Sequence, residues 1–317
     1  NANATQEWFD LANEDRLAYW QKQALERITW YKEPKEILDD SDAPFYKWFK
    51  DGELNLAYNC LDRHLETDGD RIAFYWEGEP GDSQEITYQD LYERVCKLSN
   101  GLKELGVKKG DRIAIYLGMT PEIVISMLAC ARIGAVHSVV FGGFSAEALA
   151  DRINDAEAKI VITADGAWRR GDIVPLKQNV DDSLKLTDHI ESVIVVKRTE
   201  NEVTMVDGRD YWYSELVDKQ EADCEPEVMN AEDMLYILYT SGTTAKPKGI
   251  VHTQAGYLTG VTTTHSAVFD VKEDDIYWCA ADCGWVTGHS YIVYGPLANK
   301  TTSVMYEGAP NAPDEKR

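Results

Sequence analysis

Short runs rich in isoleucine and valine alternate with helix-forming stretches through this 317-residue chain. Residues 112–117, 137–141, 159–163, 193–196 and 234–238 are predicted strands. Residues 88–105 show helical spacing, and Thr120 and Ser145 are predicted N-caps of two further helices, the first with Pro121 in its first turn. Apolar strands separated by helices predict an α/β fold. We expect doubly wound, mainly parallel sheets covered by helices, with ligands at the carboxyl ends of the strands.

The charge of the chain argues against two classes of partner. Its 32 basic and 55 acidic residues give a formal charge of −23, a field that repels nucleic acid and anionic membranes. Adaptation to salt is an alternative explanation of this acidity. The six cysteines show neither a disulfide pattern nor zinc spacing, and the longest apolar run, residues 123–131, is too short to span a bilayer. With no visible signal peptide, we expect a cytoplasmic protein without a structural metal.

A loop crowded with hydroxyls, glycines and lysines follows the strand at 234–238. Hydroxyls and backbone N–H groups donate hydrogen bonds to phosphate, and ammonium groups neutralise its charge. The loop is not a Walker A motif, because Ala245 precedes Lys246 and Pro247 follows it. A solvated surface turn is the alternative. The candidate polyphosphate-binding residues are Thr240, Ser241, Gly242, Thr243, Thr244, Lys246 and Lys248.

Residues 239–249 closely resemble the signature loop of the AMP-forming acyl-CoA synthetases, Thr-Ser-Gly-Ser/Thr-Thr-Gly-Lys-Pro-Lys-Gly, with Ala245 in place of its central glycine. Residues 48–65 resemble the N-terminal cap of the acetyl-CoA synthetases within that superfamily. The resemblance extends from about 48 to 314 and implies a helical cap over residues 1–70 and the first part of an AMP-binding domain over 71–317. It also places the C-terminal domain, with its catalytic lysine, beyond residue 317. We therefore expect the 317-residue chain alone to be inactive in adenylation.

Four other stretches, residues 141–144, 165–172, 275–290 and 306–311, become candidate sites through this resemblance. Two of them, 141–144 and 165–172, follow predicted strands. From the residues alone, 141–144 is equally well explained as a simple tight turn, and a solvated charged loop is favoured at 165–172. In the family pattern, Asp172 replaces an arginine and Ala312 a tryptophan. Residues 288–290 fail the nucleophile-elbow pattern of serine hydrolases. The resemblance implies an acyl pocket at Trp285, Val286 and Thr287, and CoA contacts at Gly143, Arg169, Arg170, Gly171, Asp172, Thr287 and Asn311.

The implied reaction is the formation of acetyl-CoA from acetate, ATP with Mg²⁺, and CoA. Acetate attacks the α-phosphorus to give acetyl-adenylate and pyrophosphate, and the CoA thiol then displaces AMP. The alternatives are a propionyl-CoA or other short-chain acyl-CoA synthetase, because the residue that sets acyl length in this family also lies beyond residue 317, and a non-catalytic nucleotide-binding fragment. No nucleic-acid or membrane partner is expected.

Overall fold

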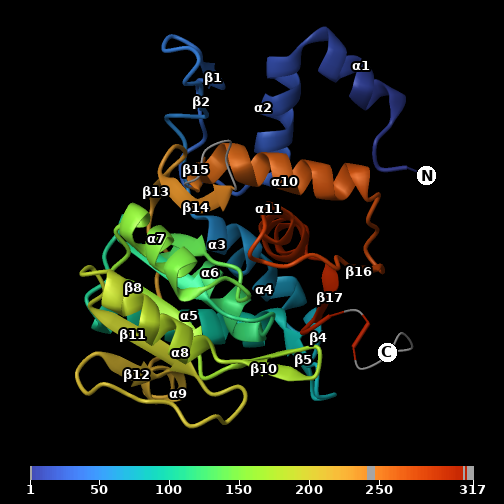
Figure 1. Ribbon diagram of the computed structural model, residues 1–317. Helices are drawn as coiled ribbons and strands as arrows, with labels where there is room; N and C mark the ends of the chain where they lie inside the picture. Colours follow the sequence, from blue (N-terminus) through green and yellow to red (C-terminus); the bar gives the residue numbers. More distant parts are fainter. Residues whose placement is uncertain (1, 241–246, 310, 313–317) are drawn as a thin grey trace.

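The computed structural model describes residues 2–240, 247–309 and 311–312 of the chain. Figure 1 shows two sheets that are surrounded by helices, with the N-terminal helices at one end of the molecule. In the described residues the larger sheet has seven strands, in the order β12 (Asp210–Trp212), β11 (Ser192–Val196), β8 (Ile160–Ala164), β6 (Arg112–Tyr116), β7 (Val136–Val139), β14 (Met234–Thr240) and β15 (Lys248–Thr253).

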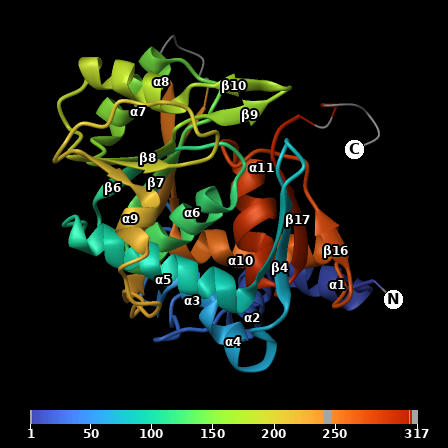
Figure 2. The same cartoon turned by 90° about the horizontal axis from the view of Figure 1, so that it is seen from below.

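All neighbouring pairs in the larger sheet are parallel except the last, β14 with β15. Strands β7, β8 and β11 are buried along their whole length, as continuous apolar sequences predict. Helices cover both faces (Figure 2). One face carries α7 (Ala146–Ala156) and α8 (Leu176–Ser183), and the other carries α5 (Tyr88–Glu104), α6 (Pro121–Ile133) and α9 (Tyr213–Val217). The predicted doubly wound α/β architecture is therefore confirmed.

The smaller sheet joins early and late parts of the chain. Its order is β16 (Ile276–Trp278), β17 (Thr302–Tyr306), β4 (Ile72–Glu77) and β5 (Ser83–Thr87), with the first three strands parallel and β5 antiparallel to β4. Between β15 and β17 the chain forms α10 (Gln254–Val268), β16, α11 (Val286–Gly288), the π-helical turn η2 (His289–Tyr294) and α12 (Gly295–Ala298).

The N-terminal part packs on α10 through its second helix and on α6 through its third helix. It consists of α1 (Gln6–Glu14), α2 (Arg16–Arg27), the short pair β1 (Leu38–Asp39) and β2 (Lys47–Trp48), and then β3 (Glu53–Leu54), α3 (Leu56–Cys60) and α4 (Asp62–Asp68). β3 pairs with β13 (Met229–Asn230), so this part is joined to the chain just before β14.

Helix α6 accounts for the longest apolar run of the sequence. Nearly all its residues are buried, since it packs against α5, α3 and the larger sheet. In the part of the chain that the structure describes, no helix combines the length and apolarity needed to cross a membrane.

Two local predictions need correction. Thr120 occupies the N-cap position of α6, but its side chain accepts no capping hydrogen bond, and its buried hydroxyl has no hydrogen-bond partner. The predicted charged loop at 165–172 contributes to a hairpin of β9 (Ala167–Arg169) and β10 (Asp172–Val174). Its two turn residues, Arg170 and Gly171, both have positive φ, +56° and +82°, the backbone geometry of a tight two-residue turn. By contrast, Ser145 caps α7 as predicted, by accepting a hydrogen bond from the backbone N–H of Ala148.

Candidate functional site

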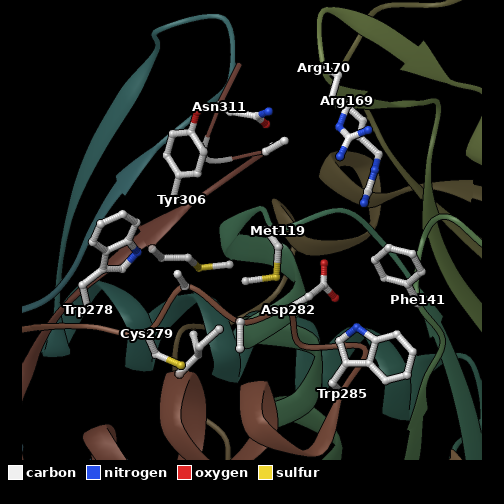
Figure 3. A pocket seen from close by; sticks show the side chains of 16 residues that line it. Met119, Phe141, Arg169, Arg170, Trp278, Cys279, Asp282, Trp285, Tyr306 and Asn311 are labelled. Atoms are coloured by element: carbon white, nitrogen blue, oxygen red, sulfur yellow. The ribbon is translucent and has the colours of Figure 1, made fainter. Parts of the chain in front are cut away.

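A cavity of about 340 Å³ lies where strand ends of the two sheets converge (Figure 3). The larger sheet contributes the segments after β6 and β7 and the β9–β10 hairpin, which follows β8. The smaller sheet contributes the carboxyl ends of β16 and β17 and the segments after them. The lining residues are Met119, Phe141, Arg169, Arg170, Trp278, Cys279, Ala280, Ala281, Asp282, Trp285, Ile292, Met305, Tyr306, Gly308, Ala309 and Asn311.

One side of the cavity combines a cation with aromatic rings. The guanidinium of Arg169 lies 4.8 Å from the centre of the Phe141 ring, a cation–π contact. The Phe141 ring in turn lies 5.8 Å from that of Trp285, between ring centres. Gly284 permits this packing, because a Cβ atom there would lie 2.8 Å from the Phe141 Cα. The wall therefore presents a planar cation on an apolar support, which suits an anionic or planar ligand group.

Asp282 supplies the carboxylate at the base of the cavity (Figure 3). Burial raises its pKa, while a hydrogen bond from the backbone N–H of Gly284, 2.7 Å from its Oδ1, and the charge of Arg169 lower it. The turn that carries Asp282 is tight. A Cβ atom on Gly288 would lie only 2.2 Å from the Asp282 carbonyl oxygen, so a residue without a side chain is required there.

The structure brings together four of the predicted acyl and CoA residues. Arg169 and Arg170 lie on one side of the cavity, Asn311 on the opposite side, and Trp285 at its base (Figure 3). They come from three segments that lie far apart in the sequence, around residues 169–170, 285 and 311. Their juxtaposition is observed, whereas their roles toward acetate and CoA remain predictions.

The other predicted acyl and CoA residues do not line this cavity. Gly171 and Asp172 belong to the same hairpin as Arg169, and Gly143 lies in the turn after Phe141. Val286 and Thr287 follow Trp285 in α11, and Val286 is 45% exposed. Of the residues that do line it, Met119, Trp278, Asp282 and Tyr306 were not among the predicted site residues.

The phosphate-loop prediction falls largely outside the described residues. Ser241, Gly242, Thr243, Thr244 and Lys246 belong to the undescribed segment 241–246.

Residues on either side of that segment are described. Thr240 and Lys248 are exposed and lie opposite each other as the last and first residues of β14 and β15. Because β14 runs parallel to β7, the chain leaves β14 at the same edge of the sheet from which the Phe141 turn leaves β7. Binding of phosphate by this loop remains a prediction.

His289 is a buried structural residue behind Trp285. Its side chain is fully buried, and its Nδ1 lies 3.1 Å from the Trp285 carbonyl oxygen, to which it donates. The ring packs 4.5 Å from that of Tyr236, between ring centres. Burial lowers the pKa of His289 to about 4, so its imidazole is neutral at neutral pH. This arrangement supports the wall that carries Trp285 and agrees with a core role rather than that of a hydrolase base.

In the stretches 2–240, 247–309 and 311–312, no group of three or more His, Cys, Asp or Glu residues is placed to hold a metal ion. The six cysteines are free thiols, and five of them are buried.

Comparison with known proteins defines the class to which this fold and cavity belong. Residues 61–317 match the family model described as AMP-binding enzyme, which covers most of the chain. The chain belongs to the AMP-binding enzyme family.

Its subgroup follows from the remaining residues and from curated relatives. Residues 5–60 match the model described as acetyl-coenzyme A synthetase N-terminus. The chain is 60% identical over its whole length to an acetyl-coenzyme A synthetase of Streptomyces avermitilis, and 57% identical over 98% of its length to that of Pasteurella multocida. It covers 49% and 48% of those two proteins, so it spans about half the length of the curated relatives it matches. The resemblance found in the sequence is therefore confirmed.

Proposed function

We propose that a protein carrying this chain is an AMP-forming acetate–CoA ligase. The observation that carries the proposal is the 55–60% identity to three acetyl-coenzyme A synthetases over the whole chain. In this proposal acetate and Mg·ATP form acetyl-adenylate and pyrophosphate, and the CoA thiol then displaces AMP. The magnesium ion arrives with the nucleotide as part of the substrate. A cytoplasmic location, where ATP and CoA are available, belongs to the same proposal.

The residues of the chain divide between the two half-reactions. The loop between Thr240 and Lys248 holds the β- and γ-phosphates of ATP during the first half-reaction. The cavity between Arg169 and Asn311 admits CoA in the second, with Arg169 facing an anionic group of the nucleotide. Trp285, Val286 and Thr287 form the wall beside the acyl group. Each of these roles is electrostatic or steric, because positioning and charge neutralisation dominate catalysis of phosphoryl chemistry.

The division of roles makes the proposal testable in a full-length protein that carries this sequence. We expect acetate-dependent pyrophosphate–ATP exchange, and acetyl-CoA formation when CoA is added. Lys248→Ala should weaken both reactions. Arg169→Ala should preserve the exchange while raising KM for CoA by about tenfold or more, the loss of a charge-assisted contact. Arg16→Ala, which removes an exposed arginine from α2, is the matched control and should change neither reaction.

Three outcomes would contradict the proposal in distinguishable ways. Faster turnover with propionate or butyrate than with acetate would assign the chain to another short-chain synthetase. Pyrophosphate–ATP exchange without consumption of CoA would show that the protein forms the adenylate but is not a CoA ligase. Titration calorimetry of ATP and CoA against the 317-residue chain tests the remaining alternative, in which binding occurs but the full-length protein catalyses no exchange.

A further inference from the structure

The carboxylate of Glu79 occupies the tip of the β9–β10 hairpin. The backbone N–H of Gly171 donates to its Oε1 over 2.6 Å, and that of Arg170 donates to its Oε2 over 3.0 Å. Glu79 lies in the β4–β5 hairpin of the other sheet and is only 8% exposed. Figure 2 shows these two hairpins meeting beside the C-terminal segment. The two sheets are thus connected at this point through one buried side chain.

The same carboxylate also contacts the segment after β17. The Ala309 N–H donates to Glu79 Oε2 over 3.3 Å. Gly308 passes so close that a Cβ atom there would lie 2.0 Å from the same oxygen, and its φ is +100°. Asn311 follows three residues later. Glu79 therefore holds both the hairpin that carries Arg169 and the segment that carries Asn311, the two opposite sides of the cavity in Figure 3.

A second buried carboxylate fixes this junction from behind. Glu307, 1% exposed, accepts the Glu79 backbone N–H over 3.2 Å. Its oxygens pair with the guanidinium of Arg198, which also donates to both oxygens of Asp82 over 2.9 and 3.1 Å. Asp82 belongs to the same β4–β5 hairpin as Glu79, so the connection between the hairpin and the end of β17 is made twice. Movement of Glu79 relative to the larger sheet is therefore opposed by a network of ionic hydrogen bonds.

The hydrogen bonds from the β9–β10 turn to Glu79 limit which groups of the cavity can bind an anion. The turn N–H groups of Arg170 and Gly171 both donate to Glu79 and are thus directed away from any ligand. Backbone N–H groups at a turn with positive φ otherwise make a good anion site. An anionic ligand group must therefore be held by side chains on this wall, and the Arg169 guanidinium depends on the hairpin for its position.

We propose that Glu79 is a positioning residue for the CoA site: it sets the distance between the Arg169 hairpin and the Asn311 segment and so determines affinity for the anionic part of CoA. The inference rests on the proposed function. It assigns Glu79 no contact with acetate, ATP or the reacting atoms. Its effect is therefore confined to the second half-reaction.

The test is steady-state kinetics of the full-length protein with Glu79→Gln. The amide keeps the size of the side chain but turns one acceptor into a donor, so one of the two hairpin N–H groups loses its acceptor. KM for CoA should rise about tenfold, while KM for ATP and the rate of acetate-dependent pyrophosphate–ATP exchange stay unchanged. Glu79→Asp, which keeps both oxygens on a shorter side chain, should show a smaller rise. Glu85→Gln makes the same chemical change at an exposed position of the same hairpin and should have no effect.

A double variant separates positioning from general destabilisation. If Glu79 acts by placing Arg169 at the right distance from the Asn311 segment, its effect requires the Arg169 guanidinium. Adding Glu79→Gln to Arg169→Ala should then raise KM for CoA by less than twofold beyond Arg169→Ala alone. If the rise in KM for CoA in the double variant equals the product of the two single-variant rises, the inference is overturned. An unchanged KM for CoA in Glu79→Gln, or an equal loss in both half-reactions for Glu79→Gln and Glu79→Asp, would overturn it too. A wild-type protein that makes acyl-adenylate but does not use CoA would overturn the proposed function instead, and this inference with it.

Discussion

Arg132 shows how strongly one region can depend on keeping both partners of a buried ion pair. Its guanidinium, 1% exposed, donates to both oxygens of Asp62 over 2.8 and 2.9 Å and to the Cys224 carbonyl over 2.6 Å. The guanidinium also lies 5.0 Å from the ring centre of Tyr92. A buried ion pair adds little net stability over an apolar pair, but losing one partner leaves an uncompensated charge.

Asp62→Ala should therefore lower the free energy of unfolding by about 3–5 kcal/mol. Denaturant titration followed by far-UV circular dichroism measures the change. The double variant Asp62→Ala with Arg132→Met should be more stable than Asp62→Ala alone, because the orphaned charge is gone. Lys185→Ala, which removes an exposed ion pair with Asp182, should lower the free energy of unfolding far less, because solvent screens that pair. Equal losses at Asp62 and Lys185 would contradict this view of Arg132.

At the scale of the secondary-structure element, Asn55, which belongs to the motif at residues 48–65, has a structural role in joining two helices. It is fully buried and caps α3 by accepting the Tyr58 N–H over 3.1 Å. Its amide nitrogen also lies 2.9–3.1 Å from three carbonyl oxygens, two at the end of α6 and one in the connector that precedes β13. One side chain thus joins the start of one helix to the end of another.

Asn55→Ala should cost about 3 kcal/mol, because it removes the cap and the hydrogen bonds that the buried amide nitrogen makes to the three carbonyl oxygens. Asp15→Ala is the comparison. Asp15 caps α2 through the N–H groups of Leu17 and Ala18, but it is exposed, so its loss should cost only about 1 kcal/mol. Thermal unfolding of both variants checks the ranking. A loss at Asn55 no larger than that at Asp15 would show that the three carbonyl contacts add nothing.

Element prediction succeeded where the signal is local. The strands β6, β7, β8, β11 and β14 and the helices between them follow from apolar runs and helical spacing, which depend only on neighbouring residues. The β9–β10 hairpin was missed for the opposite reason. Its strands are three residues long, each with one charged residue, and its turn is held by Glu79, about ninety positions earlier in the chain. Thr120 does occupy its predicted N-cap position, but its hydroxyl makes no capping hydrogen bond, because residue type identifies a cap position without fixing the rotamer.

The candidate site was predictable only in part. Arg169, Trp285 and Asn311 were proposed because whole motifs resemble a known family. Asp282 and Tyr306 carry no such signal in isolation, since one reads as a turn carboxylate and the other as a strand residue. They become cavity residues because two sheets bring their strand ends together, a property of tertiary packing.

At the scale of the whole molecule, buried histidines link stability to pH. Burial lowers the pKa of His64, His265 and His289 to about 4 in each case, against 6.5 in the unfolded chain. Between those values the unfolded state binds more protons than the folded state, so stability falls as the pH falls. The stabilising contribution is present above pH 6.5 and is lost progressively toward pH 4.

Each of these imidazoles should lower the free energy of unfolding by about 2 kcal/mol when the pH falls from 7 to 5. Denaturant titrations at the two pH values measure the loss. Because burial raises the pKa of Asp282 and Glu307 and so acts in the opposite direction, a difference between variants is the sharper measurement. In His265→Gln the loss should be smaller than in wild type by about 2 kcal/mol. Identical pH slopes in wild type and His265→Gln would refute the assignment.

The cavity wall contains two indoles, Trp278 and Trp285, which are 55% and 48% exposed. A molecule that settles between them displaces water from both rings, so their emission should shift in wavelength as the cavity fills. The protein thus provides its own fluorescent probe at the place where occupancy matters. Replacing either indole with phenylalanine would identify which side of the opening a given compound reaches first, without any attached dye.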